Sequence, residues 1–258
     1  FLQARGLPFE GAMAKSWNLR IFKHISAQVN QASMTLAAER GPCPDAADVG
    51  VMERFSCKMA IAPTASISII AGNSSPGIEP IAANVFLQKT LSGSFSVRNR
   101  HLQKLLAERG YDTDEVWSSI TVTKGSVQHL DFLTEQEKAV YKTAFELDQR
   151  WIIEHAADRT PYICQSQSLN LFLPADVHKR DLHQIHMMAW KRGVKSLYYC
   201  RSLSIQRADV VSNDAVVSPL GDQALVAPKM TTDAPGLTLP TGTPAAESNN
   251  YEECLSCQ

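Results

Sequence analysis

Hydrophobic residues between positions 11 and 40 recur at every third or fourth place, and polar or charged residues stand between them. This spacing puts the apolar side chains on one face of a helix. Gly41 and Pro42 follow directly, and both residue types end helices. The pattern therefore predicts one long helix over residues 11–40, and we expect this helix to cover the outer face of a sheet.

Shorter apolar runs follow, each of the length of a single strand. Residues 59–62 predict a buried strand, which Pro63 ends because proline cannot donate to a strand ladder. Residues 84–91 predict a second strand, which Gly93 breaks. The remaining elements predicted in this part are a loop at 42–46, helices at 98–109 and 114–120, and a helix with an acidic first turn over 134–156.

Strands and helices alternate again up to about residue 208. Residues 168–173 and 194–202 have strand patterns, and the helix predicted between them begins at a capping Asp176 and ends at Gly193. Such alternation is typical of parallel strands joined by right-handed crossovers. The predicted fold class is therefore α/β.

Composition narrows the possible partners. The 258 residues include 44% hydrophobic and 20% charged residues, which is ordinary for a soluble globular protein. The formal net charge is −1, so no basic field predicts binding to nucleic acid or to an anionic membrane. No apolar run approaches the length of a membrane span. We expect neither a membrane nor a nucleic-acid partner.

The ends of the chain and its cysteines bear on its cellular context. The N-terminal residues lack the apolar core and basic leader of a signal peptide, and the chain does not begin with Met. We therefore expect a piece of a longer protein or the product of a split gene. The six cysteines are too scattered for a secreted disulfide scaffold, which favours reduced thiols and a cytoplasmic location.

Histidines and an isolated cysteine offer little for metal binding. His183 and His186 lie three residues apart on a predicted helix and could share a face. No carboxylate or cysteine stands at ligand spacing beside them, so we predict no metal site. His155 is expected to be a helix cap or a surface residue, and Cys43 a bystander in a loop.

A run of hydroxyl residues follows the first predicted strand. Thr64, Ser66 and Ser68 come after Pro63 and precede a stretch that can enter a helix. Free backbone N–H groups and hydroxyls at such a point suit an anion, most often a phosphate. The alternative is a Ser/Thr helix cap without a ligand, since no Walker-type glycine pattern is present.

Two adjacent tyrosines, Tyr198 and Tyr199, stand in the last predicted strand. Tyrosines in a strand commonly serve packing alone. Neighbouring side chains of a regular strand point to opposite faces. If the two rings stack on each other, the backbone must be irregular, and we predict a strand end or a bulge at this position.

The last fifty residues differ from the rest. Residues 209–250 are rich in Pro, Gly, Thr, Ser and Ala without a sustained period, which predicts a disordered linker. Cys254 and Cys257 follow it as a Cys-x-x-Cys pair. Half of a zinc site, a thioredoxin-like motif and a swinging redox pair are the alternatives. A flexible tether of about 40 residues would span roughly 35 Å, which favours the swinging pair.

Three motifs together resemble one family. They are MERFSCKMAIAPTASISIIAG followed by GIEP, the Leu-Tyr-Tyr preceded by Trp190, Gly193 and Lys195, and the terminal cysteine pair. These motifs resemble the C-terminal part of the large, catalytic subunit of class I ribonucleotide reductases. The resemblance covers residues 10–208 and the last few positions, and it is nearest to the bacterial aerobic enzymes.

The resemblance implies a role for each motif. A turn formed by five residues would hold the diphosphate of a ribonucleoside diphosphate substrate, namely Pro63, Thr64, Ala65, Ser66 and Ile67. Tyr198 and Tyr199 would relay a radical from a small subunit towards a catalytic cysteine. Cys254 and Cys257 would re-reduce the active-site disulfide, and thioredoxin or glutaredoxin would reduce them in turn.

The resemblance also implies an organisation. Residues 1–208 would be the C-terminal part of a ten-stranded α/β barrel that this chain leaves incomplete, 209–250 a flexible linker, and 251–258 the redox-active tail. The catalytic cysteines, and the regions that bind the effectors ATP, dATP and other deoxynucleotides, lie upstream in the family. Cys57 and Cys164 do not match those contexts and receive no catalytic role.

Several expectations about activity and assembly follow. The isolated chain should be inactive, because activity would need the upstream polypeptide and the small subunit. This segment would bind no cofactor directly, since the radical and metal centre belongs to the small subunit, and the complete protein would be a homo-oligomer. The alternatives are a non-catalytic interaction module or a small dithiol oxidoreductase, each acting through the terminal Cys-x-x-Cys.

Overall fold

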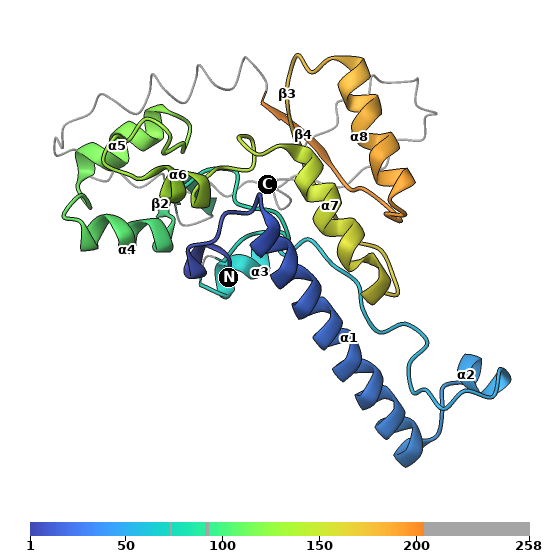
Figure 1. Ribbon diagram of the computed structural model, residues 1–258. Coiled ribbons are helices and arrows are strands. Elements are labelled where there is room, and N and C mark those ends of the chain that lie inside the picture. The colour runs from blue at the N-terminus through green and yellow to red at the C-terminus, as the bar shows by residue number, and fades with distance from the viewer. Residues whose placement is uncertain (73, 91–92, 204–258) are drawn as a thin grey trace, which may run out of the picture.

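Two clusters of buried hydrophobic residues organise the chain, whose helices and strands Figure 1 shows. The computed structural model describes residues 1–72, 74–90 and 93–203. The predicted linker and the Cys254–Cys257 pair lie outside these residues. Among the residues described, no helix combines the length and the apolar character that crossing a membrane requires.

A short 3-10 helix, η1 (Gln3–Arg5), precedes the long helix α1 (Ala12–Arg40), which Gly41 ends with a φ of 80°. The predicted helix is thus confirmed. Within the described residues, its main partner is not the expected sheet but helix α7 (Gln149–Arg159), beside which α1 packs (Figure 1). Lys15 on α1 forms salt bridges with Glu154 and Asp158 at 3.2 and 3.3 Å, which fix the two helices together.

The segment after α1 is not the loop expected at 42–46. It forms a short helix, α2 (Pro44–Asp48), with Cys43 at the N-cap position. A proline in the first turn suits a helix start, because its missing N–H would have no intrahelical acceptor there. Farther along, helix α3 (Ala65–Ile70) follows the hydroxyl turn.

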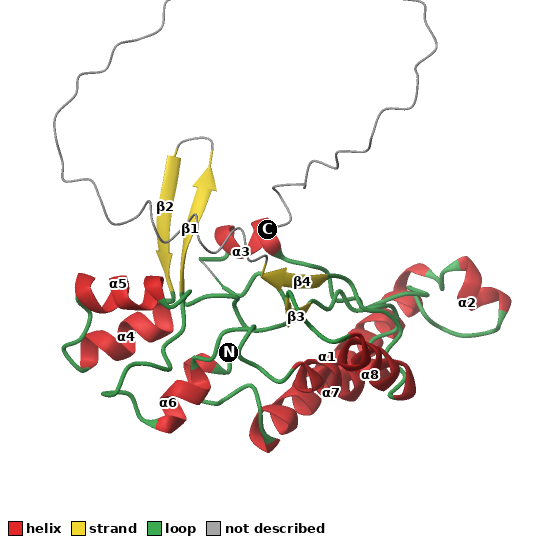
Figure 2. Ribbon diagram, turned by 90° about the horizontal axis from the view of Figure 1, so that it is seen from above, coloured by secondary structure: helices red, strands yellow, loops and turns green. Residues whose placement is uncertain are grey.

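Strand β1 (Val85–Thr90) confirms the strand predicted at 84–91. Gly93 does not simply end the strand pattern, as expected, but begins a second strand, β2 (Gly93–Arg98). The two strands pair antiparallel, with Val85 opposite Arg98. Figure 2 shows that the pair extends away from the helices. Phe86, Leu87 and Phe95 are exposed there, so β2 lacks the one-sided burial that makes a strand visible in a sequence.

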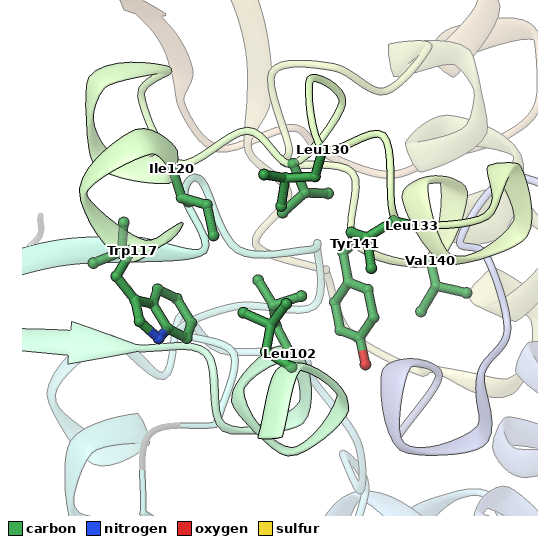
Figure 3. Close-up of a cluster of buried hydrophobic side chains, with 10 residues drawn as sticks. Leu102, Trp117, Ile120, Leu130, Leu133, Val140 and Tyr141 are labelled. Carbon is green, nitrogen blue, oxygen red and sulfur yellow. The ribbon is translucent and has the colours of Figure 1, made fainter. Parts of the chain in front are cut away.

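Helices α4 (Arg100–Glu108), α5 (Asp114–Val122) and α6 (Glu135–Val140) surround the first cluster (Figure 3). At its centre Leu102, Leu106 and Ile120 are fully buried. The Tyr141 hydroxyl donates to the His101 carbonyl at 3.1 Å, so the one polar atom of that ring is satisfied. The cluster consists of Val85, Leu102, Leu106, Trp117, Ile120, Val127, Leu130, Leu133, Val140 and Tyr141.

The helix expected over 134–156 is two helices. Thr134 and Glu137 form a capping box that starts α6 where the sequence predicts it. The chain then leaves the helix, because the Ala144 N–H donates to the Ile81 carbonyl at 2.9 Å. Helix α7 begins with its own N-cap, Asp148, which accepts the Arg150 N–H.

Strand β3 (Leu171–Pro174), helix α8 (Lys179–Lys191) and strand β4 (Cys200–Leu203) form a parallel crossover unit. The α/β class and the parallel pairing are confirmed, although both strands are shorter than predicted. The N-cap of α8 is His178, whose Nδ1 accepts the Arg180 N–H at 3.1 Å, and not Asp176 as expected. A short 3-10 helix, η2 (Thr160–Tyr162), links α7 to this unit.

The second cluster lies between α7, β3 and α8. Its members come from α7, β3 and α8 and from the residues just before α7 and β3, so these elements pack against one another. Its buried residues are Ala144, Ile152, Ile153, Ala156, Leu169, Leu171, Phe172 and Ala189.

The strand expected at 59–62 is only partly present. Ile61 forms a parallel bridge with Gln167, so the segment does pair. Ile61 is half-buried, whereas Ala60 and Ala62 are exposed, so the prediction of a buried strand was wrong. Within the part of the chain that the structure describes, this segment has a strand neighbour on one side.

A first prediction concerns Gly125, which has a φ of +83° and a close neighbour. A β-carbon there would lie 2.5 Å from the Ala83 β-carbon. Gly125→Ala should destabilise the protein by roughly 3 kcal/mol, because left-handed backbone costs about 1–2 kcal/mol and overpacking adds about 1–3 kcal/mol. Urea denaturation followed by circular dichroism measures the change in the free energy of unfolding.

Gly110 is the matched control, since its φ is +76° but no atom lies within 4 Å of the position that a β-carbon would take. Gly110→Ala should cost only the backbone part, about 1 kcal/mol. Equal losses in the two variants would show that the contact with Ala83 does not constrain this turn.

Candidate functional site

The hydroxyl turn enters a helix, as the sequence predicts. Pro63 and Thr64 directly precede α3, and Ala65, Ser66 and Ile67 form its first turn. The Thr64 carbonyl accepts the Ser68 N–H at 2.7 Å, which closes that turn. In a helix start the first amide groups have no acceptor within the helix. The turn therefore combines the backbone donors and the hydroxyl residues that an anion site requires.

A second loop holds Thr64 from outside the helix. Its N–H donates to the Pro76 carbonyl at 3.1 Å, and its hydroxyl lies 3.5 Å from the Ser75 carbonyl. Ser68 is buried, Thr64 is half-buried and Ile67 is 64% exposed. Thr64 and Ser68 thus do not share one environment, and Ser68 belongs to the interior side of the turn.

A buried carboxylate, Glu79, lies beneath this loop. Its backbone carbonyl accepts the Ser75 hydroxyl at 2.9 Å, and its Oε1 accepts the Asn170 N–H. The Asn170 amide lies 3.5 Å from Oε2. A β-carbon at position 77 would collide with Oε2, which explains the glycine there. Burial raises the pKa of the Glu79 carboxyl, although hydrogen bonds from Asn170 oppose this shift.

A buried arginine, Arg159, lies on the neighbouring helix α7 and is 3% exposed. Its Nε donates to the Gln167 side chain at 2.6 Å, and one terminal nitrogen donates to Asn18 at 3.2 Å. Burial lowers the pKa of Arg159 to about 10, while the charge of Glu79 opposes the shift. The guanidinium therefore stays charged at neutral pH and ties α1, α7 and the segment before β3 together.

Sequence reasoning missed both Glu79 and Arg159. Neither stands in a periodic apolar pattern or at a ligand spacing, and charged residues are rarely buried. Gly77, which the Glu79 carboxylate needs for space, was visible in the sequence as part of a loop of small residues. It gave no indication that a carboxylate lay against it.

One extended segment, residues 165–171, connects the turn to the tyrosines. On one side it pairs with the strand before the turn: the Gln165 N–H donates to Met59 and the Ser168 N–H to Ile61, at 3.0 and 2.8 Å. On its other side the Tyr198 N–H donates to Leu169 at 2.8 Å. The entrance to the hydroxyl turn and the tyrosine pair therefore flank the same segment, one interstrand spacing of about 5 Å on each side.

Tyr198 and Tyr199 come directly before the first residue of β4, Cys200. The predicted strand end is confirmed. Their ring centroids lie 4.1 Å apart with an interplanar angle of 57°, and both side chains are more than 40% exposed. The Arg201 guanidinium lies 5.4 Å from the Tyr199 ring centroid. Such exposure does not fit rings whose only role is to fill a core.

The histidines that the sequence singles out have other surroundings than a metal site among the described residues. His155 is 2% exposed and its Nε2 lies 2.9 Å from the Phe9 carbonyl, so the expected surface or cap position was wrong. Burial lowers the pKa of His155. His186 Nδ1 lies 2.8 Å from the Leu182 carbonyl of its own helix. In the described part of the chain, no three His, Cys, Asp or Glu side chains are grouped so that they could hold a metal ion.

Comparisons with known proteins agree with one another. Residues 46–200 match the family model described as the ribonucleotide reductase barrel domain. The ribonucleoside-diphosphate reductase large subunit of Invertebrate iridescent virus 6 is 48% identical over 224 residues, which covers 85% of this chain and 23% of that protein. The large subunit of Invertebrate iridescent virus 3 is 46% identical over 214 residues, which covers 82% of this chain and 34% of that protein.

A solved structure gives the same result. The class Id ribonucleotide reductase alpha subunit of Actinobacillus ureae superimposes with a TM-score of 0.72 at 38% identity, covering 81% of this chain and 38% of that one. The chain thus spans less than two fifths of the length of these relatives. The expectation that the chain is nearest to bacterial enzymes is not confirmed, since the two viral large subunits above are more similar, at 48% and 46% identity.

The buried Glu79 generates a pH prediction. Because the pKa of its carboxyl is raised above 4.5 in the folded protein, the folded state binds more protons than the unfolded state above that pH. The contribution of Glu79 to stability should therefore fall as the pH rises from 4.5 through the folded-state pKa. Glu79→Gln removes this fall, so the free energy of unfolding of the variant minus that of the unmodified chain should rise between pH 4.5 and 8, as measured in urea.

The matched control is Glu146→Gln, which removes a carboxylate elsewhere that accepts the Ser126 hydroxyl at 2.5 Å and the Thr143 N–H at 2.7 Å. That variant should keep the pH dependence of the unmodified chain. An unchanged slope in Glu79→Gln would mean that the Glu79 carboxyl titrates as it does in water.

Proposed function

The chain belongs to the ribonucleotide reductase large-subunit family, and on this basis we propose that it works as part of a ribonucleoside-diphosphate reductase. The reaction replaces the 2′-hydroxyl of a ribonucleoside diphosphate by hydrogen through a thiyl radical. This segment would contribute a turn for the substrate phosphates, a relay of two tyrosines, and a dithiol that restores the reduced active site.

The proposal rests on one observation: the residues leading into the turn and the two tyrosines pair with the same extended segment. Residues 165–171 pair with the segment that enters the turn on one side and with Tyr198 and Tyr199 on the other. A substrate held at the turn would therefore lie within a short distance of the relay. Radical chemistry needs that proximity, because the oxidised group must reach the substrate.

The turn offers a diphosphate two kinds of donor. The first turn of α3 has backbone N–H groups without intrahelical acceptors, and the helix dipole favours negative charge there. Thr64 and Ser66 would add hydroxyl groups, with Pro63, Ala65 and Ile67 shaping the backbone. The loop at Ser75 and Pro76 holds Thr64 in place, so the donors are positioned before the substrate arrives.

The tyrosine pair suits transfer of one electron together with one proton. A phenol that loses both becomes a neutral radical, and the neighbouring ring at 4.1 Å is close enough to exchange with it. The exposure of both rings leaves room for a partner surface to contact them. That partner would be the small subunit, whose metal or radical centre supplies the oxidising equivalent.

The terminal Cys254 and Cys257 would deliver the reducing electrons. A thiolate of the pair attacks the active-site disulfide, the second cysteine resolves the mixed disulfide, and the tail leaves oxidised. Thioredoxin or glutaredoxin then reduces it by the same two exchanges. A linker over 209–250 would give the pair the reach to alternate between the active site and the reductase.

Other components would come from outside this segment. The catalytic cysteines and the effector sites for ATP, dATP and other deoxynucleotides would lie in the remaining part of the large subunit. The chain by itself should therefore leave CDP unchanged. A cytoplasmic location and assembly into a homo-oligomer belong to the same proposal.

The relay can be tested in a chimera in which this chain replaces the corresponding region of the Invertebrate iridescent virus 6 large subunit. With the cognate small subunit, Tyr198→Phe and Tyr199→Phe should each reduce dCDP formation to the assay background, because phenylalanine cannot give up a proton with its electron. The folded content by circular dichroism should not change.

Tyr111→Phe is the matched control for the relay. Tyr111 is 42% exposed, as Tyr199 is, and stacks on Phe132 at 3.9 Å far from β4. Its replacement should leave turnover within about twofold, as is usual for a surface substitution. Normal turnover in either of the two relay variants would contradict the proposed path.

The dithiol can be tested in the same chimera with Cys254→Ser and Cys257→Ser together. Turnover supported by thioredoxin should be lost, whereas turnover supported by dithiothreitol should persist, because a small dithiol reaches the active-site disulfide directly. If thioredoxin still supported full turnover, the tail would not be the reductant. If dithiothreitol failed as well, the two serines would have damaged more than electron delivery.

A further inference from the structure

Two exposed thiols lie beside each other at the start of the pairing between residues 58–61 and 165–168. Cys57 and Cys164 are both free and exposed. Cys164 directly precedes the extended segment 165–171, and Cys57 directly precedes residues 58–61, which pair with that segment. Neither has a part in the proposed reaction.

The contacts of Cys164 set the distance between the two residues. Its Sγ accepts the backbone N–H groups of Lys58 and Met59 at 3.0 and 3.1 Å. In a trans peptide the preceding α-carbon lies on the same side as the N–H group, and the described chain has no cis peptide bond. Covalent geometry then puts the Cys57 α-carbon about 4 Å from the Cys164 sulfur.

The backbone pairing does not give this distance by itself. Ile61 lies opposite Gln167, whereas the Gln165 N–H donates to the Met59 carbonyl at 3.0 Å, so the register shifts by one residue before it reaches Cys164. The contact of the sulfur gives the limit: it lies about 3 Å from its own α-carbon and about 4 Å from that of Cys57, so the two α-carbons are at most about 7 Å apart. Disulfides join α-carbons that are roughly 4.4–6.8 Å apart, so a bond can form without a large movement of the backbone.

The surroundings of Cys164 favour its thiolate. In its protonated form the Cys164 thiol can donate to the Met59 carbonyl at 3.2 Å. Burial would raise the pKa of this thiol, but backbone N–H groups, those of Met59 and Lys58 foremost, together outweigh burial and lower the pKa. Lys195 holds the loop in place: its ammonium donates to the carbonyls of Ile163, Cys164 and Gln165 at 3.0, 2.7 and 3.2 Å. An accessible thiolate of lowered pKa is the form of cysteine that oxidants attack.

We propose that Cys57 and Cys164 are a redox modification site and form a reversible disulfide when the chain meets a hydroperoxide. The bond would tie the segment that leads into the hydroxyl turn to the loop before β3. It would also remove the thiolate that accepts the Lys58 and Met59 N–H groups, so oxidation changes the entrance to the turn.

The step balances with a hydroperoxide as the oxidant. The Cys164 thiolate attacks one peroxide oxygen, the O–O bond breaks, and Cys164 becomes a sulfenic acid while the other oxygen leaves as hydroxide or alkoxide. The Cys57 thiol then attacks the sulfenic sulfur, the disulfide forms, and water leaves. Two electrons pass from the two sulfurs to the peroxide. A dithiol reverses the bond by two exchanges.

The test uses the full chain with Cys254→Ser and Cys257→Ser, so that the tail cannot exchange with the new bond. Hydrogen peroxide is added at one equivalent, free thiols are alkylated with iodoacetamide, and tryptic peptides are mapped by mass spectrometry without reduction. Peptides 55–58 and 160–179 should appear joined, with the loss of two alkylatable thiols. Dithiothreitol should release both peptides with their thiols restored.

Cys200 is the internal control. It is also free and exposed, but it lies on strand β4, opposite Leu171 of β3. It should remain alkylated after peroxide, and before peroxide it should react with iodoacetamide more slowly than Cys164. In a Cys57→Ser variant Cys164 should stop at the sulfenic acid and be trapped by dimedone.

The proposal is overturned if Cys57 and Cys164 both stay alkylatable, if Cys164 passes to the sulfinic acid while Cys57 stays free, or if Cys164 joins Cys200 or Cys43 instead. The mapping needs no small subunit and no turnover. Its result is therefore independent of whether the tyrosine relay and the tail act as proposed.

Discussion

The backbone hydrogen bonds of one segment, residues 165–171, determine where the other parts of the site lie. Gln167, Leu169 and Leu171 are at most 4% exposed, so their backbone groups cannot rely on water and need protein partners. Leu169 and Leu171 bond to Tyr198 and Tyr199 on one side of the segment. On the other side, Gln165, Ser166 and Ser168 bond to Met59 and Ile61. The residues that lead into the hydroxyl turn and the two tyrosines both form hydrogen bonds with the backbone of this segment. For this reason the turn and the tyrosines lie near each other. Two regions about 130 residues apart in sequence thus come together on either side of one segment.

Buried charge fixes what surrounds that segment. Glu79 and Arg159 are both at most 4% exposed, a position that charged groups rarely occupy without partners. Glu79 accepts from Asn170, and Arg159 donates to Gln167 and Asn18, so each is held by an amide side chain or backbone group rather than by a direct ion pair. Amide partners fix direction as well as distance. The network therefore makes the positions of α1, α7 and the loop below the turn depend on one another.

Features that depend on local chemistry could be predicted from the sequence. The capping box at Thr134, the glycine end of the long helix at Gly41 and the parallel unit around α8 all follow from short-range patterns. Features that depend on distant partners could not. The chain leaves the helix after Val140 because Ala144 bonds to Ile81, and His155 is buried because Phe9 covers it. Strand β2 was not predicted for a related reason. Both faces of the β1–β2 pair are exposed, so hydrophobic and polar residues do not alternate along the strand.

The candidate site also contains features that could be predicted from local patterns and features that could not. The strand end at Tyr198 was predictable, because two adjacent rings cannot meet across a regular strand. The role of Lys195 was not, although the residue belonged to a recognised spacing. Gly193 ends α8 with a φ of 74°, and two residues later the Lys195 ammonium caps three carbonyls of the loop that holds Cys164. The chain then reaches Tyr198 within three residues. Lys195 therefore connects the segment that leads to Tyr198 with the loop that contains Cys164. Oxidation of Cys164 would act on a loop that this lysine already holds.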